Sequence, residues 1–360
     1  MGEPEGSYCV RRDKMTSKRV GILLTQIGTP DTPTTTAVRR YLRYFLSDQR
    51  VVDYHPWFWK PLLYSIILTF RPRRSAKLYK EIWTEVGSPL RIHMMNQQQS
   101  LQQMLGENYR VELGLAYSEP SIKNALSLFR EEGIEDITVL PLFPQYSSST
   151  TASIYDTVYF EARGGRGGRV NTLHRFIPAL RFIGAYYDHP LYIQALAEHL
   201  RDHVLKLSYV PDKYIFTFHG IPQRYVQTGD PYYEQCQVTA KLLASQLGLD
   251  QQDWVISFQS KFGPEQWLTP ATFEIIKQLP PLGIKAPVVF APGFVADCLE
   301  TIHELGIEGR EVFINAGGSA NTYNVIPCLN DSQAWITLLA SLAKQEEQSE
   351  NKRLDGYTDI

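Results

Sequence analysis

The chain has 360 residues, of which 43% are hydrophobic and 21% are charged, which is enough apolar material for two domains with cores of their own. A formal net charge of −2 provides no overall field that would attract nucleic acid, so we predict no nucleic-acid partner. No apolar run approaches the roughly 20 residues that cross a bilayer, which excludes a membrane-spanning helix from the prediction.

The four cysteines are Cys9, Cys236, Cys298 and Cys328, and no pair has the spacing of a metal clip or a redox motif. A chain of this size does not need disulfides for stability, so we predict a reducing, cytoplasmic compartment. Residues 1–17 contain several basic side chains and no apolar core. They predict a disordered tail rather than a signal peptide.

Short β-rich apolar runs alternate with longer segments of helical periodicity along the chain. The expected strands are 20–25, 111–116, 137–142, 214–218, 255–258 and 288–291, and the expected helices include 35–46, 121–131, 191–205, 233–247 and 271–278. This alternation predicts parallel βαβ units with helices on both faces of each sheet. The pattern occurs twice, so we expect an α/β fold with two domains, 18–185 and 186–342, and a polar tail at 343–360.

Ligands of open α/β sheets bind beyond the carboxyl ends of the strands, so residues that directly follow strands are candidates for the site. His219 follows the expected strand 214–218 and precedes Gly220. Imidazole titrates near neutrality and is the commonest metal ligand, which makes His219 a candidate base or ligand. A histidine that caps the next turn fits this position equally well.

Glu300 lies in the segment that follows the expected strand 288–291. Asp297 and Glu300 have the spacing of a helix N-cap and its reciprocal partner, so Glu300 is either a reactive carboxylate or a capping residue. Between them, Cys298 has no second cysteine nearby and predicts a small packed side chain rather than a nucleophile.

Glu300, Glu304 and Glu308 recur every four residues along one expected helix. In a regular α-helix such a row drifts around the axis, whereas a local widening toward i→i+5 bonding would bring the carboxylates nearer to one line. Gly306 lies in this stretch and eases such a distortion. The row is either a solvated acidic face or a route that carries metal in or protons out.

Three other segments have two interpretations each. The hydroxyl-rich segment 144–153 holds an anion at a helix N-terminus or provides helix caps. The Gly- and Arg-rich segment 163–169 resembles an RNA-binding tract, but it fits a flexible surface loop better. The Trp-rich apolar segment 57–70, followed by Arg71, Arg73 and Arg74, is a membrane-surface lip, the mouth of an apolar pocket or a buried helix.

Nine segments, in chain order over residues 20–335, together resemble the ferrochelatase family. They are GTPD at 28–31, YLRYFLSDQRVVD at 41–53, GSPL at 87–90, LPLFPQYSSSTT at 140–151, FHGIPQRY at 218–225, GDPY at 229–232, FQSKFGPEQWL at 258–268, PGFVADCLET at 292–301 and IPCLNDS at 326–332. The resemblance implies two Rossmann-like domains that enclose a porphyrin cleft, and an enzyme that inserts Fe²⁺ into a porphyrin in the last step of haem synthesis.

By this resemblance, the catalytic residues that meet the metal and the pyrrole protons are His219 and Glu300. The family's substrate-binding positions fall on Ser88, Arg74, Tyr117, Trp267 and Phe294. Residues 54–75 match the apolar lip at the cleft mouth, which predicts peripheral contact with the inner membrane. The chain has Ala116 where many members have an arginine before the residue matching Tyr117.

The resemblance favours protoporphyrin IX as the organic substrate, with coproporphyrin or another tetrapyrrole as the alternative. A non-catalytic tetrapyrrole-binding protein is the alternative from another functional class. Ferrous iron is a substrate and no cofactor is retained. Animal-type members carry a cysteine-rich extension that binds an iron–sulfur cluster, and the tail here contains no cysteine, so no cluster is expected. The oligomeric state is not predicted.

Overall fold

The computed structural model of the protein describes residues 19–165 and 173–355. The predicted disordered tail, residues 1–17, lies outside the described residues. Residues 166–169 of the Gly- and Arg-rich segment lie outside them as well.

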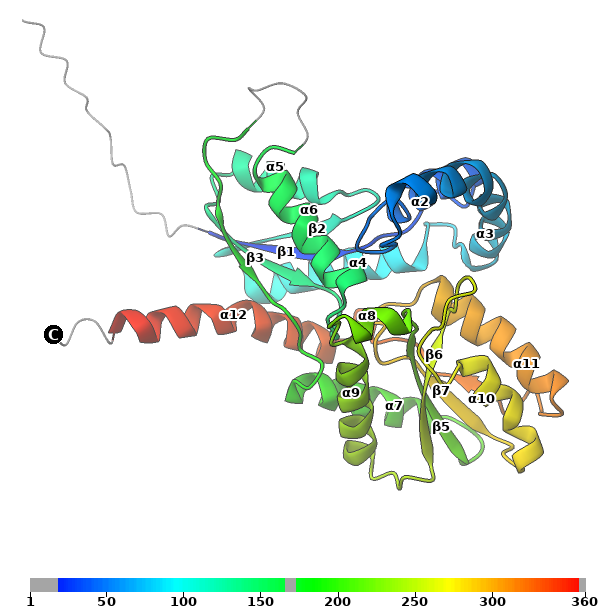
Figure 1. Ribbon diagram of the computed structural model, residues 1–360. Helices are drawn as coiled ribbons and strands as arrows, with labels where there is room; N and C mark the ends of the chain where they lie inside the picture. The colour runs from blue at the N-terminus through cyan, green and yellow to red at the C-terminus, as the bar shows by residue number, and fades with distance from the viewer. Residues whose placement is uncertain (1–18, 166–172, 356–360) are drawn as a thin grey trace, which may run out of the picture.

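Two four-stranded parallel sheets form the centres of the two halves of the chain (Figure 1). The first has the order β2-β1-β3-β4 and comprises β1 (Val20–Gln26), β2 (Tyr109–Leu115), β3 (Asp136–Pro141) and β4 (Ala179–Phe182). The second has the order β6-β5-β7-β8 and comprises β5 (Lys213–His219), β6 (Trp254–Gln259), β7 (Pro287–Phe290) and β8 (Asn324–Val325). The predicted α/β class and the repeated architecture are therefore confirmed.

The sequence analysis missed two strands, β4 and β8. Both lie at the edge of a sheet, and neither contains a fully buried residue. Short, half-exposed edge strands lack the continuous apolar run by which the central strands are recognised.

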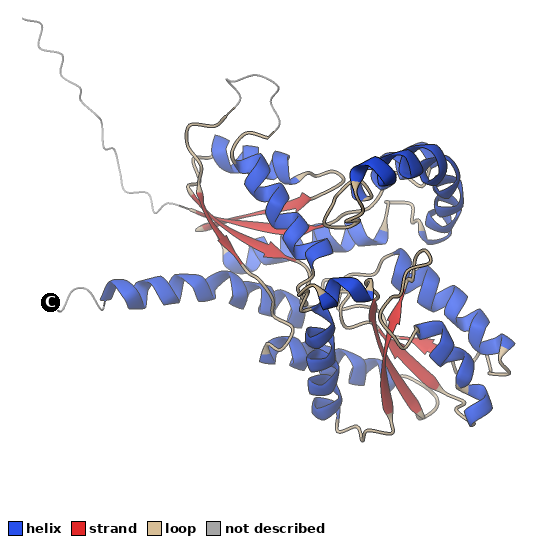
Figure 2. Ribbon diagram, viewed as in Figure 1, coloured by secondary structure: helices blue, strands red, loops and turns tan. Residues whose placement is uncertain are grey.

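Helices lie on both sides of each sheet (Figure 2). The α-helices are α1 (Thr35–Phe45), α2 (Pro56–Leu62), α3 (Leu68–Ile82), α4 (Pro89–Leu105), α5 (Ile122–Glu131), α6 (Ser153–Ala162), α7 (Pro190–Val204), α8 (Gln223–Gln227), α9 (Tyr232–Leu247), α10 (Thr272–Gln278), α11 (Gly309–Asn315) and α12 (Gln333–Asp355). Three π-helices, η1 (Leu63–Ile67), η2 (Ser148–Ala152) and η5 (Glu300–Glu308), and a 3₁₀ turn, η4 (Pro280–Leu282), complete the described elements.

Local signals explain why the expected helices form where they do. The Thr34 hydroxyl accepts a hydrogen bond from the Ala37 amide at the start of α1, and the Ser121 hydroxyl accepts one from the Asn124 amide at the start of α5. At the end of α9, Gly248 adopts a φ of 73°, the left-handed conformation that terminates helices. All five expected helices agree with the structure within one residue at each end.

One hydrophobic core extends through both halves of the chain. Leu24 and Met94 of the first half and Phe218 and Trp335 of the second belong to the same buried cluster. The C-terminal helix α12 packs against both α4 and α7, and it continues past residue 343, where the predicted polar tail begins, to Asp355.

The segment α2–η1–α3, here called the lip, has one buried face and one exposed face. Trp59, Leu63 and Leu68 pack against α1, whereas Trp57 and Phe58 are 82% and 80% exposed. The lip extends to one side of the first sheet, above α11 (Figure 1). The prediction of a buried helix is therefore correct for the inner face of this segment, whereas its outer face is exposed. No helix among the described residues is long and apolar enough to span a membrane.

Candidate active site

His219 is the last residue of β5, at the carboxyl end of the central strand of the second sheet. Its Nδ1 lies 2.6 Å from the carbonyl oxygen of Gly220. A carbonyl only accepts, so Nδ1 carries the proton and donates. In the neutral imidazole, Nε2 then carries the lone pair, which can accept a proton or bind a metal.

The turn after His219 is held rigidly. The Gly220 amide donates to the Gln259 carbonyl of β6 over 2.8 Å. A Cβ on Gly220 would lie only 2.9 Å from that carbonyl oxygen and 3.1 Å from the Trp267 ring, so a side chain does not fit here. The carbonyl that orients the imidazole is therefore itself fixed by the neighbouring strand.

Two of the predicted substrate-binding aromatic residues flank this imidazole. The rings of Trp267 and Phe294 both have their centroids 6.4 Å from that of His219. Trp267 reaches the site from the loop after β6, and Phe294 from the loop after β7. An imidazole edged by two aromatic rings suits the face of a flat, apolar ligand.

Glu300 is the first residue of the π-helix η5, and the capping interpretation of this residue is wrong. The Asp297 carboxylate accepts hydrogen bonds from Asn330 Nδ2, the Cys328 amide and the Thr301 hydroxyl. Thr301 in turn accepts from the Cys298 amide at 3.0 Å. The Asp297 amide, from which a capping Glu300 would accept, instead donates to Asn330 Oδ1 at 2.8 Å, so Glu300 makes no capping bond there.

Cys298 packs beside Glu300 as a protonated thiol. Burial raises the pKa of this thiol well above its ordinary value, and the charge of Glu300 and a hydrogen bond to it act in the same direction. A thiol with a raised pKa is a poor nucleophile and a poor metal ligand. Its predicted role as a small packed side chain agrees with this environment.

The widened helix expected from the row of glutamates is confirmed, because Glu300–Glu308 form a continuous π-helix. The Glu304 carboxylate accepts from the Ser260 amide at 2.7 Å and the Ser260 hydroxyl at 2.5 Å. Burial raises the pKa of Glu304, and Glu300 adds to this rise, while Ser260 and His219 oppose it. Glu304 is thus not part of a solvated acidic face, and it lies within electrostatic reach of both His219 and Glu300.

Ser260 follows β6 with a φ of 64°, which is unusual for a residue with a side chain. In this conformation both its amide and its hydroxyl reach one carboxylate 44 residues away. Strained backbone of this kind is found preferentially at functional sites. Ser260 was missed by the sequence analysis because it lies in a loop and forms no local pattern.

The lip helix α3 and the neighbouring helix α1 contribute charged and phenolic groups that interact electrostatically with Glu300. Burial lowers the pKa of the Arg71 guanidinium, and the charge of Glu300 opposes this change. Burial raises the pKa values of Tyr41 and Tyr79, and Glu300 raises both further. Arg71 also lies over the ring of Phe262, with its guanidinium carbon 4.3 Å from the centroid. Among the arginines of this helix, Arg71 is therefore the one whose charge interacts with Glu300.

The other predicted substrate-binding residues occupy different environments. Ser88 is buried, and its hydroxyl lies 3.0 Å from that of Thr29. Arg74 lies on the exposed side of α3. The Tyr117 hydroxyl is bonded to Asp48 at 2.7 Å and to Ser153 at 2.6 Å, so it serves within the first half.

The hydroxyl-rich segment holds an anion that the protein itself supplies. Asp230 accepts from the Ser147 hydroxyl at 2.9 Å and from the Ser148 amide at 2.7 Å. Ser147 also accepts from the Ser149 amide, so it acts as a cap. Both interpretations of this segment are therefore correct, and an external anion is not required.

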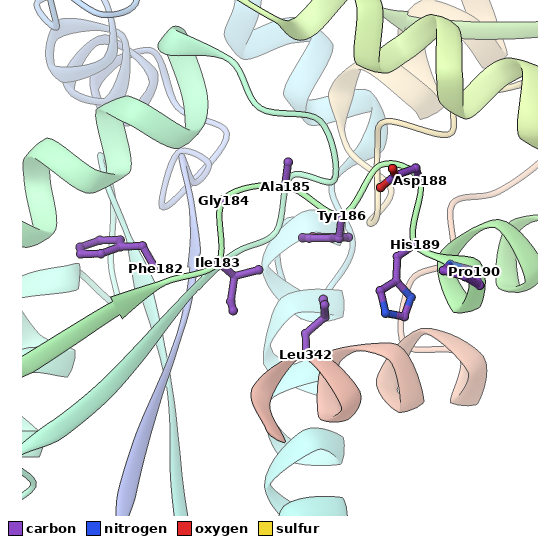
Figure 3. A pocket seen from close by; sticks show the side chains of 9 residues that line it. All are labelled: Phe182, Ile183, Gly184, Ala185, Tyr186, Asp188, His189, Pro190 and Leu342. Atoms are coloured by element: carbon purple, nitrogen blue, oxygen red, sulfur yellow. The ribbon is translucent and has the colours of Figure 1, made fainter. Parts of the chain in front are cut away.

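A cavity of about 390 Å³ lies where the chain passes from β4 to α7, and Leu342 of α12 closes one side (Figure 3). Its lining includes Tyr186, Asp188 and His189, whose side chains are labelled in the close-up. None of the predicted site residues lines this cavity.

Two parallel sheets of equal strand order, with His219 at the end of β5 and Glu300 in the segment after the neighbouring strand β7, define an α/β protein with the chelatase fold. Solved structures show the same fold. SirB from Bacillus subtilis with Fe³⁺ has a TM-score of 0.52 at 10% identity and covers 92% of this chain and 98% of its own. The sirohydrochlorin chelatase SirB from B. subtilis subspecies spizizenii in complex with cobalt has a TM-score of 0.51 at 9% identity, covering 92% and 96%.

The ferrochelatase family model matches residues 19–347. Ferrochelatase 1 of Shewanella oneidensis is 47% identical over 337 residues, which cover 92% of this chain and 97% of the relative. Coproporphyrin III ferrochelatase of Streptococcus mutans is 45% identical over 336 residues, covering 92% and 99%. The chain therefore belongs to the ferrochelatase family, and it is an enzyme that inserts metal into a porphyrin.

Proposed function

We propose that the porphyrin is protoporphyrin IX and that the product is protohaem. The observation that carries the catalytic part of this proposal is the imidazole of His219, whose Nδ1–H is committed to Gly220 and whose Nε2 is free. Glu304 of the π-helix lies within electrostatic reach of both His219 and Glu300. An imidazole base and carboxylates suit a reaction in which two pyrrole protons leave and a ferrous ion enters.

In this mechanism His219 accepts one pyrrole proton at Nε2, while Glu300 contacts the ferrous ion and passes the second proton toward Glu304. Inner N–H protons of a flat porphyrin are hard to remove, so the enzyme has to bend the ring with binding energy from its apolar faces. Trp267 and Phe294 beside His219 supply such a surface. A single carboxylate ligand leaves the ion incompletely coordinated, which favours its transfer into the ring.

Coproporphyrin III is the second candidate substrate, because the Streptococcus mutans relative named for it is 45% identical to this chain. The decisive assay measures Fe²⁺ insertion into protoporphyrin IX and coproporphyrin III anaerobically, by the change in the Soret band. We expect a higher kcat/KM with protoporphyrin IX. A preference for coproporphyrin III would overturn the substrate assignment, and no insertion into either would overturn the whole proposal.

We also propose that Glu304 and Glu308 belong to a route that carries metal toward Glu300 or protons away from it. The carboxylate of Glu304 is half-buried between the Ser260 contacts and Glu300, as a relay group would be. Glu308 lies further along the π-helix and is partly exposed, with its Oε1 3.6 Å from His303 Nδ1.

The double variant Glu304→Gln/Glu308→Gln should lower the turnover rate at limiting Fe²⁺ by about tenfold. This loss is smaller than the ~10²-fold loss in rate that removal of a directly acting acid or base causes. Glu311→Gln, on the exposed face of α11, is the matched control and should be normal. Porphyrin affinity should be unchanged. Full activity of the double variant would show that these two carboxylates lie off the route.

The exposed face of the lip is proposed to contact the surface of the inner membrane, while the enzyme is cytoplasmic. Trp57, Phe58 and Phe70 are exposed there next to Arg73 and Arg74, and this combination binds anionic lipid surfaces.

Replacing Trp57 and Phe58 with Ser should weaken binding to anionic vesicles at least about tenfold, because each buried aromatic ring contributes about 1.5–3 kcal/mol. Trp59 should be left intact, since its indole is buried and donates to the Leu46 carbonyl. Leu205→Ser/Val210→Ser removes two comparably exposed apolar side chains elsewhere and serves as the control. Equal flotation of both variants with wild type would exclude the lip as the membrane contact.

We further propose that the enzyme retains no iron–sulfur cluster. The described cysteines, Cys236, Cys298 and Cys328, are buried, and the polar segment after residue 343 has none. Acid-labile sulfide in stoichiometric amounts in the anaerobically purified protein would contradict this.

A further inference from the structure

A buried imidazole connects the lip helix to the π-helix. His303 of η5 has its Nε2 2.9 Å from Oε2 of Glu81 on α3, and its side chain is 7% exposed. The Glu81 side chain is 52% exposed. Neither residue was singled out by the sequence analysis, and they lie 222 positions apart in the chain.

The bond between these residues is directional. A carboxylate only accepts, so Nε2–H of His303 donates to Glu81. The other ring nitrogen of His303, Nδ1, lies 3.6 Å from Oε1 of Glu308, which is beyond hydrogen-bond distance. The two carboxylates lie at different ring nitrogens, so one metal ion could not bind all three groups. Among the described residues no cluster of three or more such side chains is arranged to hold a metal.

The bond lies beside the reactive carboxylate. On α3, Tyr79 precedes Glu81 by two residues, and on η5, Glu300 precedes His303 by three. Tyr79 and Arg71 of α3 are both within electrostatic reach of Glu300. The hydrogen bond at His303 thus joins the helix that carries Glu300 to the helix that carries Arg71 and Tyr79.

We propose that Glu81 and His303 are positioning residues, which hold the π-helix against the lip helix so that Glu300 keeps its place relative to the opposite wall of the site. This proposal rests on the role of Glu300 in metal insertion proposed above. Because Glu81 is half exposed, the pair adds little to global stability. A shift of about 1 Å at a reacting group can nevertheless cost up to ~10²-fold in rate.

Glu81→Ala and His303→Leu should each lower kcat about tenfold, with the KM for porphyrin changed by less than about twofold, because only the geometry of the reacting groups is disturbed. His303→Gln should retain most of the activity, since its amide can donate to Glu81 in a side chain of similar volume. Glu85→Ala, at an exposed position just beyond α3, is the control and should behave as wild type.

The double variant Glu81→Ala/His303→Leu distinguishes a shared contact from two separate defects. We expect it to be no slower than the slower single variant, because the same bond is lost in all three proteins. Additive losses, a His303→Gln variant as slow as His303→Leu, or single variants with normal kcat would each overturn the proposal.

Hydrogen exchange provides a readout that does not depend on the reaction. In Glu81→Ala without porphyrin, amides of residues 300–308 should exchange faster, with the melting temperature little changed. Unchanged exchange in this segment would overturn the positioning role even if activity fell. Faster exchange combined with an inactive wild-type enzyme would instead indicate that the proposed reaction, not the contact, is wrong.

Discussion

His219→Ala should lower metal insertion by about 10²–10⁴-fold, the usual loss when a positioned base is removed. The Nδ1–H of His219 is held by the Gly220 carbonyl, so the side chain presents a fixed Nε2, and no other histidine is close enough on β5 or its neighbours among the described residues to replace it. The measurement is kcat by Soret change under saturating Fe²⁺ and porphyrin.

Circular dichroism and the melting temperature should remain near wild type, because the His219 side chain is only partly buried and is the last of its strand. Added imidazole should restore part of the lost rate if the missing function is proton acceptance. His174→Ala, at a partly exposed position in the first half, is the control. Near-normal turnover of His219→Ala would remove this residue from the mechanism.

Glu300→Gln is expected to lower kcat by at least about 10²-fold, while porphyrin still binds. The amide keeps the size of the side chain and can still accept from the Cys298 thiol, but it lacks the charge that attracts ferrous iron and receives protons. The loss should persist at saturating Fe²⁺, because it arises at the ring and not during delivery. Fluorescence quenching of bound porphyrin measures binding separately from turnover.

The same substitution should lower the pKa values of the groups around Glu300. The carboxylate raises the pKa of Tyr41, Tyr79 and Glu304, after burial as the main cause. Without its charge, the pKa of Glu304 should fall, so this group ionises at lower pH in the variant. Carbon-13 NMR of the glutamate carboxyls can detect the change. An unaltered Glu304 titration together with wild-type kcat would contradict both assignments.

Much of the fold could be predicted from sequence, because the central strands are short apolar runs. Such runs can be recognised without knowing which other segments of the chain pair with them. The strands β1 and β5 are buried along most of their length, and they follow the expected ranges closely. The edge strands β4 and β8 are half exposed, and their pairing depends on a neighbour that is already in place. Local sequence does not carry that information.

The placement of His219 and Glu300 relative to the second sheet could also be expected from sequence, for a topological reason. In a parallel sheet every carboxyl end lies at the same edge, so His219 at the end of β5 and Glu300 in the segment after β7 belong to the same edge of the second sheet. The widened helix could be anticipated from Glu300, Glu304 and Gly306, since local spacing and a residue with low helix propensity act within one segment.

By itself, then, the sequence determined the α/β class, the repeated βαβ pattern and the distortion of the helix that carries Glu300 and Glu304. Only the tertiary structure decided the partners of these groups: Ser260 on Glu304, Arg71 and Tyr79 opposite Glu300, and Glu81 on His303. The physical reason is separation along the chain, because a bond between residues 44 or 222 positions apart leaves no periodicity in either segment. Such contacts form only after the helices and strands have packed and brought the two segments together.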